Sequence, residues 1–465
     1  MGTLSIRTRL IGSFIFFVLV AGSFSTLGLA EKFYTDGIKI KDDQGREVIL
    51  RGTQLINKRA DYLPWHREPQ FDRLLSWGFN VIRLGVLWSE IEPQPYVYND
   101  AYLAEIDRYI QWAKARGILV VVDMHQDLFS EKFNGDGAPE WATLDEGVPY
   151  QYREPWWVNY FHTAVLNAFK NFWRNTGGVQ DHFIRAWVRV AERYADESAV
   201  IGFDLYNEPW NGYFPPVVFD LLYLQPFYER LIPAMQVVAP DKLYFFEPAA
   251  VTNTGAPSFM TRMRFTNLVA APHYYNPAAE LRRGYEDLDI LLTRAAFATR
   301  DMEARIWQTP WWLGEFGTET GFRNHLKYMD DVCRQVESSQ VGSSYWEYAR
   351  DIDGMGLELP NGEEKPLVNV LARTYPQRIA GRLRSYRFDL ESKVFQMTFE
   401  ESSEVAGPTI IFLPQARHYP EGFSISSTDA DGSWVWELMD GSNVLQLWAD
   451  PNSRFHTITI RPAQP

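Results

Sequence analysis

The sequence predicts an α/β fold: a parallel (β/α)8 TIM barrel followed by a small C-terminal β-sandwich. Three observations lead to it. Short apolar runs alternate with helical runs about eight times up to residue 375, as expected of a closed parallel barrel. Two of those runs, Val200–Trp210 and Trp311–Gly317, each carry a glutamate at or near their end. After residue 376 the helical pattern disappears and only short β-like runs remain.

The length and the charge of the chain limit the number of domains and the kinds of partner. The chain has 465 residues, too many for one ordinary core, so we expect a barrel at 31–376 and a β-sandwich at 380–465. The formal net charge is -14, which argues against nucleic acid as a partner. A single cysteine, Cys333, excludes an intrachain disulfide and a cysteine-based zinc cluster. We expect this thiol to pack within a helix and to have no reactive role.

Residues 1–30 have the pattern of a secretory signal peptide. Arg7 and Arg9 form a basic start, an apolar stretch follows at 11–20, and small residues at 28–30 resemble a cleavage site. An uncleaved membrane anchor is the alternative, because the apolar tract is nearly long enough to span a bilayer. In both cases the protein is expected to be secreted or to work outside the cytoplasm.

The elements follow in chain order. A hairpin with a polar turn is expected at 38–50, and the first barrel strand with its loop at 51–58. The later barrel strands are expected at 80–86, 118–125, 200–206, 242–248, 267–275, 311–315 and 342–347. Helices are expected at 100–116, 158–175, 179–195, 217–238, 285–305 and 324–338, and an irregular insertion at 126–156. The sandwich strands are expected at 383–389, 394–400, 409–413, 422–426, 433–438, 444–447 and 455–460.

The two glutamates at strand ends point to glycoside hydrolysis. Pro209 cannot donate to a strand ladder, so pairing stops there and leaves Asn207 and Glu208 at the mouth of the barrel. Glu315 ends a second run in the same way. A retaining glycosidase needs a protonated carboxyl and an ionised one about 5–5.5 Å apart. Asn207 is placed to hold the sugar 2-hydroxyl.

These motifs resemble glycoside hydrolase family 5. Asn207-Glu-Pro and Leu313-Gly-Glu-Phe-Gly look like its acid/base and nucleophile motifs. The closest likeness is to the endoglycoceramidase-like subgroup, through Asp123-Met-His-Gln-Asp127, Gly135-Asp-Gly-Ala-Pro-Glu-Trp-Ala142 and Asn171-Phe-Trp173, together with the C-terminal β domain.

The resemblance implies a role for each site residue. Glu208 would be the acid/base and Glu315 the nucleophile, kept ionised by positive and hydrogen-bonding neighbours. The family pattern adds Arg83, whose fixed charge would lower a nearby carboxylate pKa, and His273, Tyr275 and Trp346. Tyr274 is the rival of Tyr275, because neighbouring strand residues point to opposite sides. Lys58, His125 and Asp127 are further candidates for binding sugar hydroxyls. Glu247 lacks a preceding Asn and is left out.

The implied activity is retaining cleavage between glycan and ceramide in glycosphingolipids, without a metal or a cofactor. The substrate is then a glycosphingolipid or an oligosaccharide, with presentation at a membrane surface as one option. The apolar segment 210–227 predicts a lipid trough that includes Phe214 and Leu222, although an ordinary inward-packing helix is the alternative. Two other functions stay open: an endo-β-1,4-glucanase or β-glucosidase acting on soluble glycans, and a glycan-binding barrel without turnover. The insertion at 126–156 is expected to select the head group.

Overall fold

The computed structural model describes residues 31–59, 62–402, 404–405, 407–439 and 441–463. The expected signal segment at 1–30 lies outside these residues. Among the described residues, no helix combines the length and the apolar character needed to cross a membrane.

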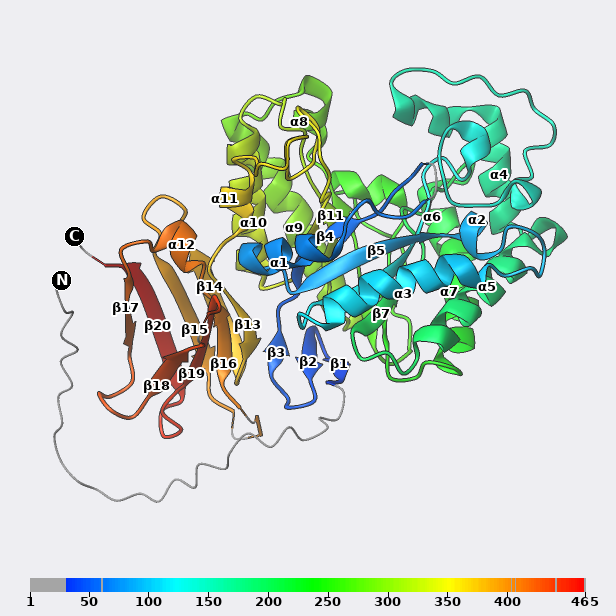
Figure 1. The fold of residues 1–465 in the computed structure, drawn as a ribbon. Helices are drawn as coiled ribbons and strands as arrows, with labels where there is room; N and C mark the ends of the chain where they lie inside the picture. The colour runs from blue at the N-terminus through cyan, green and yellow to red at the C-terminus, as the bar shows by residue number, and fades with distance from the viewer. Residues whose placement is uncertain (1–30, 60–61, 403, 406, 440, 464–465) are drawn as a thin grey trace. The chain divides into compact units, whose positions relative to one another are not determined.

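The central sheet is parallel throughout and forms the predicted barrel (Figure 1). Its strand order is β10-β11-β12-β4-β5-β6-β7-β8-β9. The strands are β4 (Arg51–Leu55), β5 (Val81–Leu87), β6 (Leu119–His125), β7 (Val200–Asp204), β8 (Leu243–Phe246), β9 (Leu268–Ala270), β10 (His273–Tyr274), β11 (Leu313–Phe316) and β12 (Ser343–Tyr345). β9 and β10 are consecutive in the chain, and a parallel bridge joins Ala270 to Trp311 beside β11, so the sheet closes on itself.

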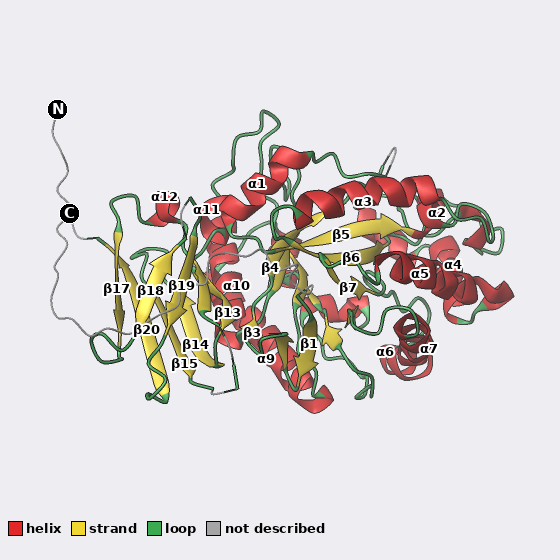
Figure 2. Ribbon diagram, turned by 60° about the horizontal axis from the view of Figure 1, so that its bottom comes forward, coloured by secondary structure: helices red, strands yellow, loops and turns green. Residues whose placement is uncertain are grey.

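Helices cover the outside of the barrel, and Figure 2 shows α3 and α5 alongside the strands. The long helices are α1 (Glu68–Trp77), α3 (Asp100–Lys114), α4 (Thr163–Trp173), α5 (Val179–Tyr194), α7 (Gln225–Gln236), α9 (Ile290–Trp307) and α10 (His325–Ser339). α3 shows why the periodicity predicts them: Asn99 caps it by accepting from the Tyr102 amide, and Leu103, Ile106 and Ile110 are buried on one face. α1 was not predicted.

Three regions differ from the expected helices. The helix expected at 285–305 begins only at Ile290, as α9, because a 3-10 turn, η7 (Asp287–Asp289), precedes it. The helix expected at 217–238 consists of α6 (Pro216–Phe219), a π-helical turn η5 (Asp220–Leu224) and α7. The helix expected from residue 158 begins only at Thr163, because a 3-10 turn, η3 (Trp156–Phe161), precedes it. The insertion between β6 and η3 contains two further 3-10 turns, η1 (Glu131–Phe133) and η2 (Glu140–Ala142), and is otherwise irregular as predicted.

The C-terminal region consists of two antiparallel sheets. One has the order β14-β15-β20-β17, with β14 (Arg382–Phe388), β15 (Phe395–Glu400), β20 (Phe455–Pro462) and β17 (Phe423–Ser427). The other has the order β1-β2-β3-β13-β16-β19-β18, with β1 (Phe33–Asp36), β2 (Lys39–Asp42), β3 (Glu47–Val48), β13 (Tyr375–Ile379), β16 (Thr409–Phe412), β19 (Val444–Trp448) and β18 (Val435–Leu438). Alternating inward residues such as Phe395, Met397 and Phe399 of β15 build the core.

The second sheet draws strands from both ends of the described chain. β3 pairs antiparallel with β13, so the N-terminal hairpin extends the C-terminal sheet instead of standing alone before the barrel. The hairpin was predicted, but neither its extra strand β1 nor β13 was. The domain limits at 376 and 380 stay a prediction. Cys333 is buried in α10 and forms no disulfide.

Candidate active site

The mouth of the barrel brings the predicted polar residues together. In a parallel strand every second side chain points inward, so Asp123 and His125 of β6 both face the interior. Apart from Arg83, which lies near the start of β5, the other members come from the C-terminal parts of neighbouring strands or directly after them, which is where barrel chemistry lies. They are Arg83 on β5, Asn207 and Glu208 after β7, His273 on β10 with Tyr275 after it, Glu315 on β11 and Trp346 after β12.

Glu208 and Glu315 face each other across His273. A carboxylate oxygen of each and a ring nitrogen of His273 all lie within 4.8 Å of one another. Nδ1 of His273 is 2.9 Å from Oε1 of Glu208 and 3.7 Å from Oε2 of Glu315. The Asn253 amide also donates to Glu208, at 2.7 Å. This spacing agrees with the short separation of a retaining pair and not with the wider separation of an inverting one.

The backbone at Glu208 is strained. Its φ of 45° lies in the left-handed region, which a non-glycine residue rarely adopts. The strain is held in place by the neighbouring strand, because the Glu208 amide donates to Oε2 of Glu247 at 2.8 Å. Strained residues of this kind concentrate at functional sites, where the surrounding structure holds them.

Tyr275, and not Tyr274, reaches Glu315. The Tyr275 hydroxyl donates to Oε1 of Glu315 at 2.5 Å. The Tyr274 hydroxyl instead bonds to Thr293 of α9, at 3.1 Å, in the wall of the barrel. Gly314, directly before Glu315, lets β11 lie close to the chain at Ala271, because a Cβ at that position would lie 2.8 Å from the Ala271 carbonyl oxygen.

Arg83 holds the floor of the site together. It is fully buried and donates to Asp204 at 2.7 Å, to Asp123 at 2.8 Å and to Glu247 at 2.9 Å. Its distance to Glu315 is longer, 3.5 Å. The expected effect of Arg83 on Glu315 is therefore shared among several carboxylates.

The charge balance at Glu315 corrects the expectation that its neighbours simply lower its pKa. Burial raises the pKa of Glu315 above its ordinary value, and His273 and Arg83 oppose that increase. The negative charge of Glu208 adds to it. Burial likewise opposes the charged form of His273, but Glu247 and Glu315 outweigh it and raise the pKa of His273 well above its usual range.

Glu247 belongs to this network, although it was left out of the sequence prediction. Its side chain is buried, pairs with Arg83 and lies 3.1 Å from Nε2 of His273. Glu247 directly follows strand β8 and precedes Pro248, which is the same strand-end signal that identified Glu208. The missing Asn shows only that Glu247 is not a second copy of the Asn-Glu-Pro motif, and it does not exclude Glu247 from the site. Asp123, Asp204 and Asn253 were also missed as site residues.

Lys58, His125, Asp127 and Trp346 form a second polar group beside the glutamates. The Lys58 ammonium pairs with Asp127 and lies 4.1 Å from the centre of the Trp346 ring. The His125 ring stacks on Trp346, with ring centres 5.4 Å apart and planes 14° apart. Nδ1 of His125 is 2.8 Å from Asp123. Burial and Lys58 oppose the imidazolium, but Asp123 and Asp127 raise the pKa of His125 to about 9.

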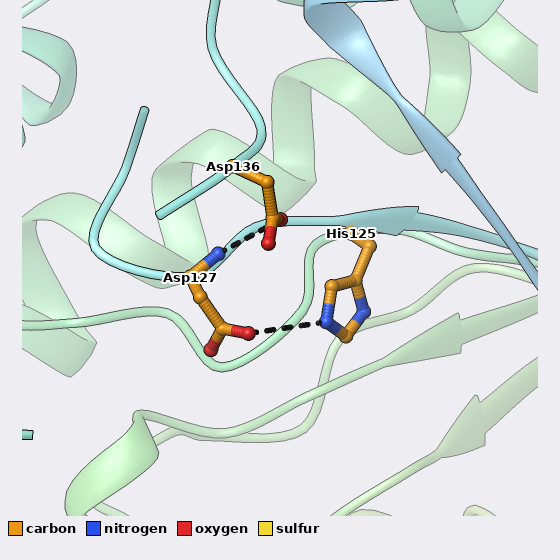
Figure 3. A group of neighbouring side chains, drawn as sticks. All are labelled: His125, Asp127 and Asp136. Atoms are coloured by element: carbon orange, nitrogen blue, oxygen red, sulfur yellow. Dashed lines mark hydrogen bonds and ion pairs between the residues drawn. The ribbon is translucent and has the colours of Figure 1, made fainter. Parts of the chain in front are cut away.

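Asp136 completes a cluster with His125 and Asp127, as Figure 3 shows. The Asp127 amide donates to Oδ1 of Asp136 at 3.1 Å. Burial, reinforced by the charge of Asp127, raises the pKa of Asp136 to about 7. Ligand atoms of these three residues lie within 4.8 Å of one another, a spacing that could hold a cation. The Lys58 ammonium already supplies positive charge to this cluster. That the protein needs no metal stays a prediction.

The expected lipid trough is only partly exposed. Phe214 is 9% exposed and stacks on Tyr223, so it packs inward and cannot form an open lipid surface. Leu222, in the π-helical turn, is 66% exposed. Other exposed aromatic residues flank the same loop: Phe161 contacts Trp210 edge-on, and Tyr213 reaches Asn167 of α4.

Comparison with known proteins agrees with this geometry. Residues 42–351 match the model of the cellulase family, glycosyl hydrolase family 5, and residues 373–460 match the glycoside hydrolase family 5 C-terminal domain. An endoglycoceramidase of Hydra vulgaris is 30% identical over 82% of this chain and 80% of its own length. The structure of endo-glycoceramidase II from a Rhodococcus species with ganglioside GM3 superposes with a TM-score of 0.83, 30% identity, and coverage of 91% of this chain and 99% of that chain. The same enzyme as a lactosyl-enzyme intermediate gives the same TM-score, identity and coverage.

Proposed function

The chain belongs to glycoside hydrolase family 5, and we propose that it cleaves the β-glycosidic bond between oligosaccharide and ceramide in glycosphingolipids with retention of configuration. The observation that carries this proposal is the pair Glu208 and Glu315, whose nearest carboxylate oxygens lie within 4.8 Å. The similarity to endoglycoceramidases over most of the chain supports the glycolipid as substrate.

The proposed mechanism uses two displacements. The Glu315 carboxylate attacks the anomeric carbon while the protonated Glu208 gives its proton to the departing ceramide oxygen. The bond from sugar to ceramide breaks, and a bond from sugar to Glu315 forms. Glu208 then removes a proton from water, which attacks the same carbon and releases Glu315. The solved lactosyl-enzyme intermediate of the Rhodococcus relative supports a covalent route.

The surrounding side chains are assigned by their contacts. Tyr275 orients Glu315 through its hydroxyl, and His273 lies between the two carboxylates. Asn207, held by Arg83 at 3.0 Å, is placed to bind the sugar 2-hydroxyl. Lys58, His125 and Asp127 offer hydrogen-bonding groups beside Trp346, which would form the floor of the sugar site.

We further propose that the protein works outside the cytoplasm on substrate presented at a membrane surface. The basic and apolar pattern of residues 1–30 supports export. Exposed Leu222 and the exposed aromatic residues of η3 and its neighbouring loop support contact with lipid. A soluble glucan as substrate is the rival within the same chemistry.

The experiment is incubation of the purified protein with a panel of glycosphingolipids, beside Glu315→Gln, followed by thin-layer chromatography and mass spectrometry. Intact oligosaccharide and ceramide, absent with Glu315→Gln, are expected. Release of one monosaccharide from a longer glycan would indicate an exo-glycosidase. Activity on soluble glucan without cleavage of any lipid would refute the glycolipid proposal, and bound sugar without any cleavage would favour a binding protein.

A further inference from the structure

Glu347 is a carboxyl group at the mouth of the barrel that neither the fold nor the proposed mechanism explains. It directly follows Trp346 and is half-buried. Among the described residues, no hydrogen bond and no ion pair within 4 Å reaches its side-chain oxygens. Its oxygens do not belong to the buried polar atoms that lack a partner, so solvent, and equally a hydroxyl group of a ligand, can reach them. An unpartnered carboxyl beside a sugar-binding tryptophan needs a reason.

The charged groups that act on Glu347 come from four segments of the barrel. They are Lys58 after β4, His125 on β6, Glu315 on β11 and Asp351 beyond β12. Lys58 has the largest charge effect on Glu347, but it pairs with Asp127 and lies over Trp346. Glu347 therefore lies next to Trp346 in the chain and within the influence of the charges of the second polar group.

We propose that the Glu347 carboxyl binds a hydroxyl group of the sugar chain on the glycan side of the scissile bond, and so helps to set which glycans are accepted. This inference rests on the proposed function, because it takes the sugar to lie on Trp346. A sugar hydroxyl would give the solvent-accessible carboxyl a fixed hydrogen-bond partner in place of water. A site built to hydrogen-bond a hydroxyl discriminates strongly against sugars that lack it or orient it differently.

The protonation state of Glu347 gives the proposal a measurable signature. Burial raises the pKa of Glu347 to about 7, with Lys58 opposing the increase and Glu315 adding to it. Below that pH the carboxyl carries a proton and both donates and accepts. Above it the group becomes acceptor-only and adds negative charge near Glu315. Sugar binding that depends on the donor should weaken as the pH rises through about 7.

The test compares Glu347→Ala and Glu347→Gln with the unaltered protein on an aryl β-lactoside and on lactosylceramide. We expect Glu347→Ala to raise KM for both substrates about tenfold or more, with a smaller effect on kcat. Glu347→Gln keeps a donor and an acceptor, so its KM should stay within about threefold at pH 6. Its KM should also not increase between pH 6 and pH 8, unlike that of the unaltered protein.

Controls separate this role from a structural one. Glu363→Ala removes an exposed glutamate nearby in the chain and should leave KM and its pH dependence unchanged. Asp136 titrates in the same range, but it is still present in Glu347→Gln, so any pH dependence lost there belongs to Glu347. Equal KM values in all variants, or a uniform loss of kcat without a change in the pH profile, would overturn the proposal. Failure of the proposed function itself would give a different result, because activity would then persist in Glu315→Gln.

Discussion

The hydroxyl of Tyr275 donates a short hydrogen bond to Glu315, and the removal of this hydroxyl should be visible in the pH profile. Burial raises the pKa of Glu315, and the nucleophile must be ionised, so kcat/KM should fall as the pH drops through that raised pKa. A hydrogen bond to the charged carboxylate favours the charged form. Tyr275→Phe should therefore shift this acidic limb to higher pH and lower kcat about 10²-fold.

Tyr274→Phe is the matched control for Tyr275→Phe. It removes a hydroxyl that bonds to Thr293 and does not reach Glu315. Measurement of kcat/KM on an aryl glycoside between pH 4 and pH 9 would compare the two. An identical acidic limb in Tyr275→Phe and the unaltered protein would show that the tyrosine does not stabilise the ionised glutamate.

At the scale of residues, the sequence predicted the two glutamates because each stands where a strand-like run stops. The structure adds what a single position does not reveal. Arg83 contacts carboxylates from three other strands, so its partners depend on barrel closure and not on its own neighbours in sequence. The pKa of Glu315 also depends on burial, which the sequence does not show.

The π-helical turn Asp220–Leu224 gives the lipid hypothesis a sharper test than the sequence did. Leu222 is exposed at the start of the helix that follows β7, whereas Phe214 is buried. Leu222→Ser should lower kcat/KM on a ceramide-linked glycan several-fold, because less apolar surface meets the lipid chains. It should leave turnover of a soluble aryl glycoside unchanged, since that substrate carries no lipid.

Val237→Ser is the control on the same run of helix. Val237 is 81% exposed at the far end of α7, which runs away from the barrel mouth. Both substrates should be turned over normally by this variant. Equal losses on both substrates in Leu222→Ser would remove Leu222 from the lipid surface.

At the scale of elements, helices and strands with strong periodicity were predicted closely, and irregular ones were not. The strand at 118–125 and α3 have clear apolar patterns and lie where expected. The π-helical turn and the late start of α4 are local departures from regular helix that the apolar pattern does not show. The Asn159 side-chain amide, for example, donates to the carbonyls of Arg153 and Trp156 and holds the turn before α4.

At the scale of the whole described chain, the number of barrel units was predictable, but the joining of its ends was not. The pairing of β3 with β13 brings together residues more than 300 positions apart. Two strands so far apart in sequence carry no shared pattern that would reveal that they pair. The union depends on the tertiary fold, which brings the polypeptide at residue 47 beside the polypeptide at residue 379.

Arg373 links helix α10 to the first strand of the smaller sheet, and its loss should weaken the whole described fold. The side chain is fully buried and donates to Glu337 and Asp330 of α10, each at 2.6 Å, and to the Phe388 carbonyl of β14 at 2.6 Å. Glu337 is buried as well and accepts from the Phe388 amide. Arg373→Met would leave the Glu337 charge without its cation, which costs about 3–5 kcal/mol. Because this loss lowers the free energy of unfolding, we expect the midpoint of urea unfolding to move to a lower urea concentration. Arg334→Ala, which removes an exposed partner of Asp330, should change the free energy of unfolding by at most about 1 kcal/mol. Similar midpoints for the two variants would show that the buried pair does not stabilise the contact between α10 and β14.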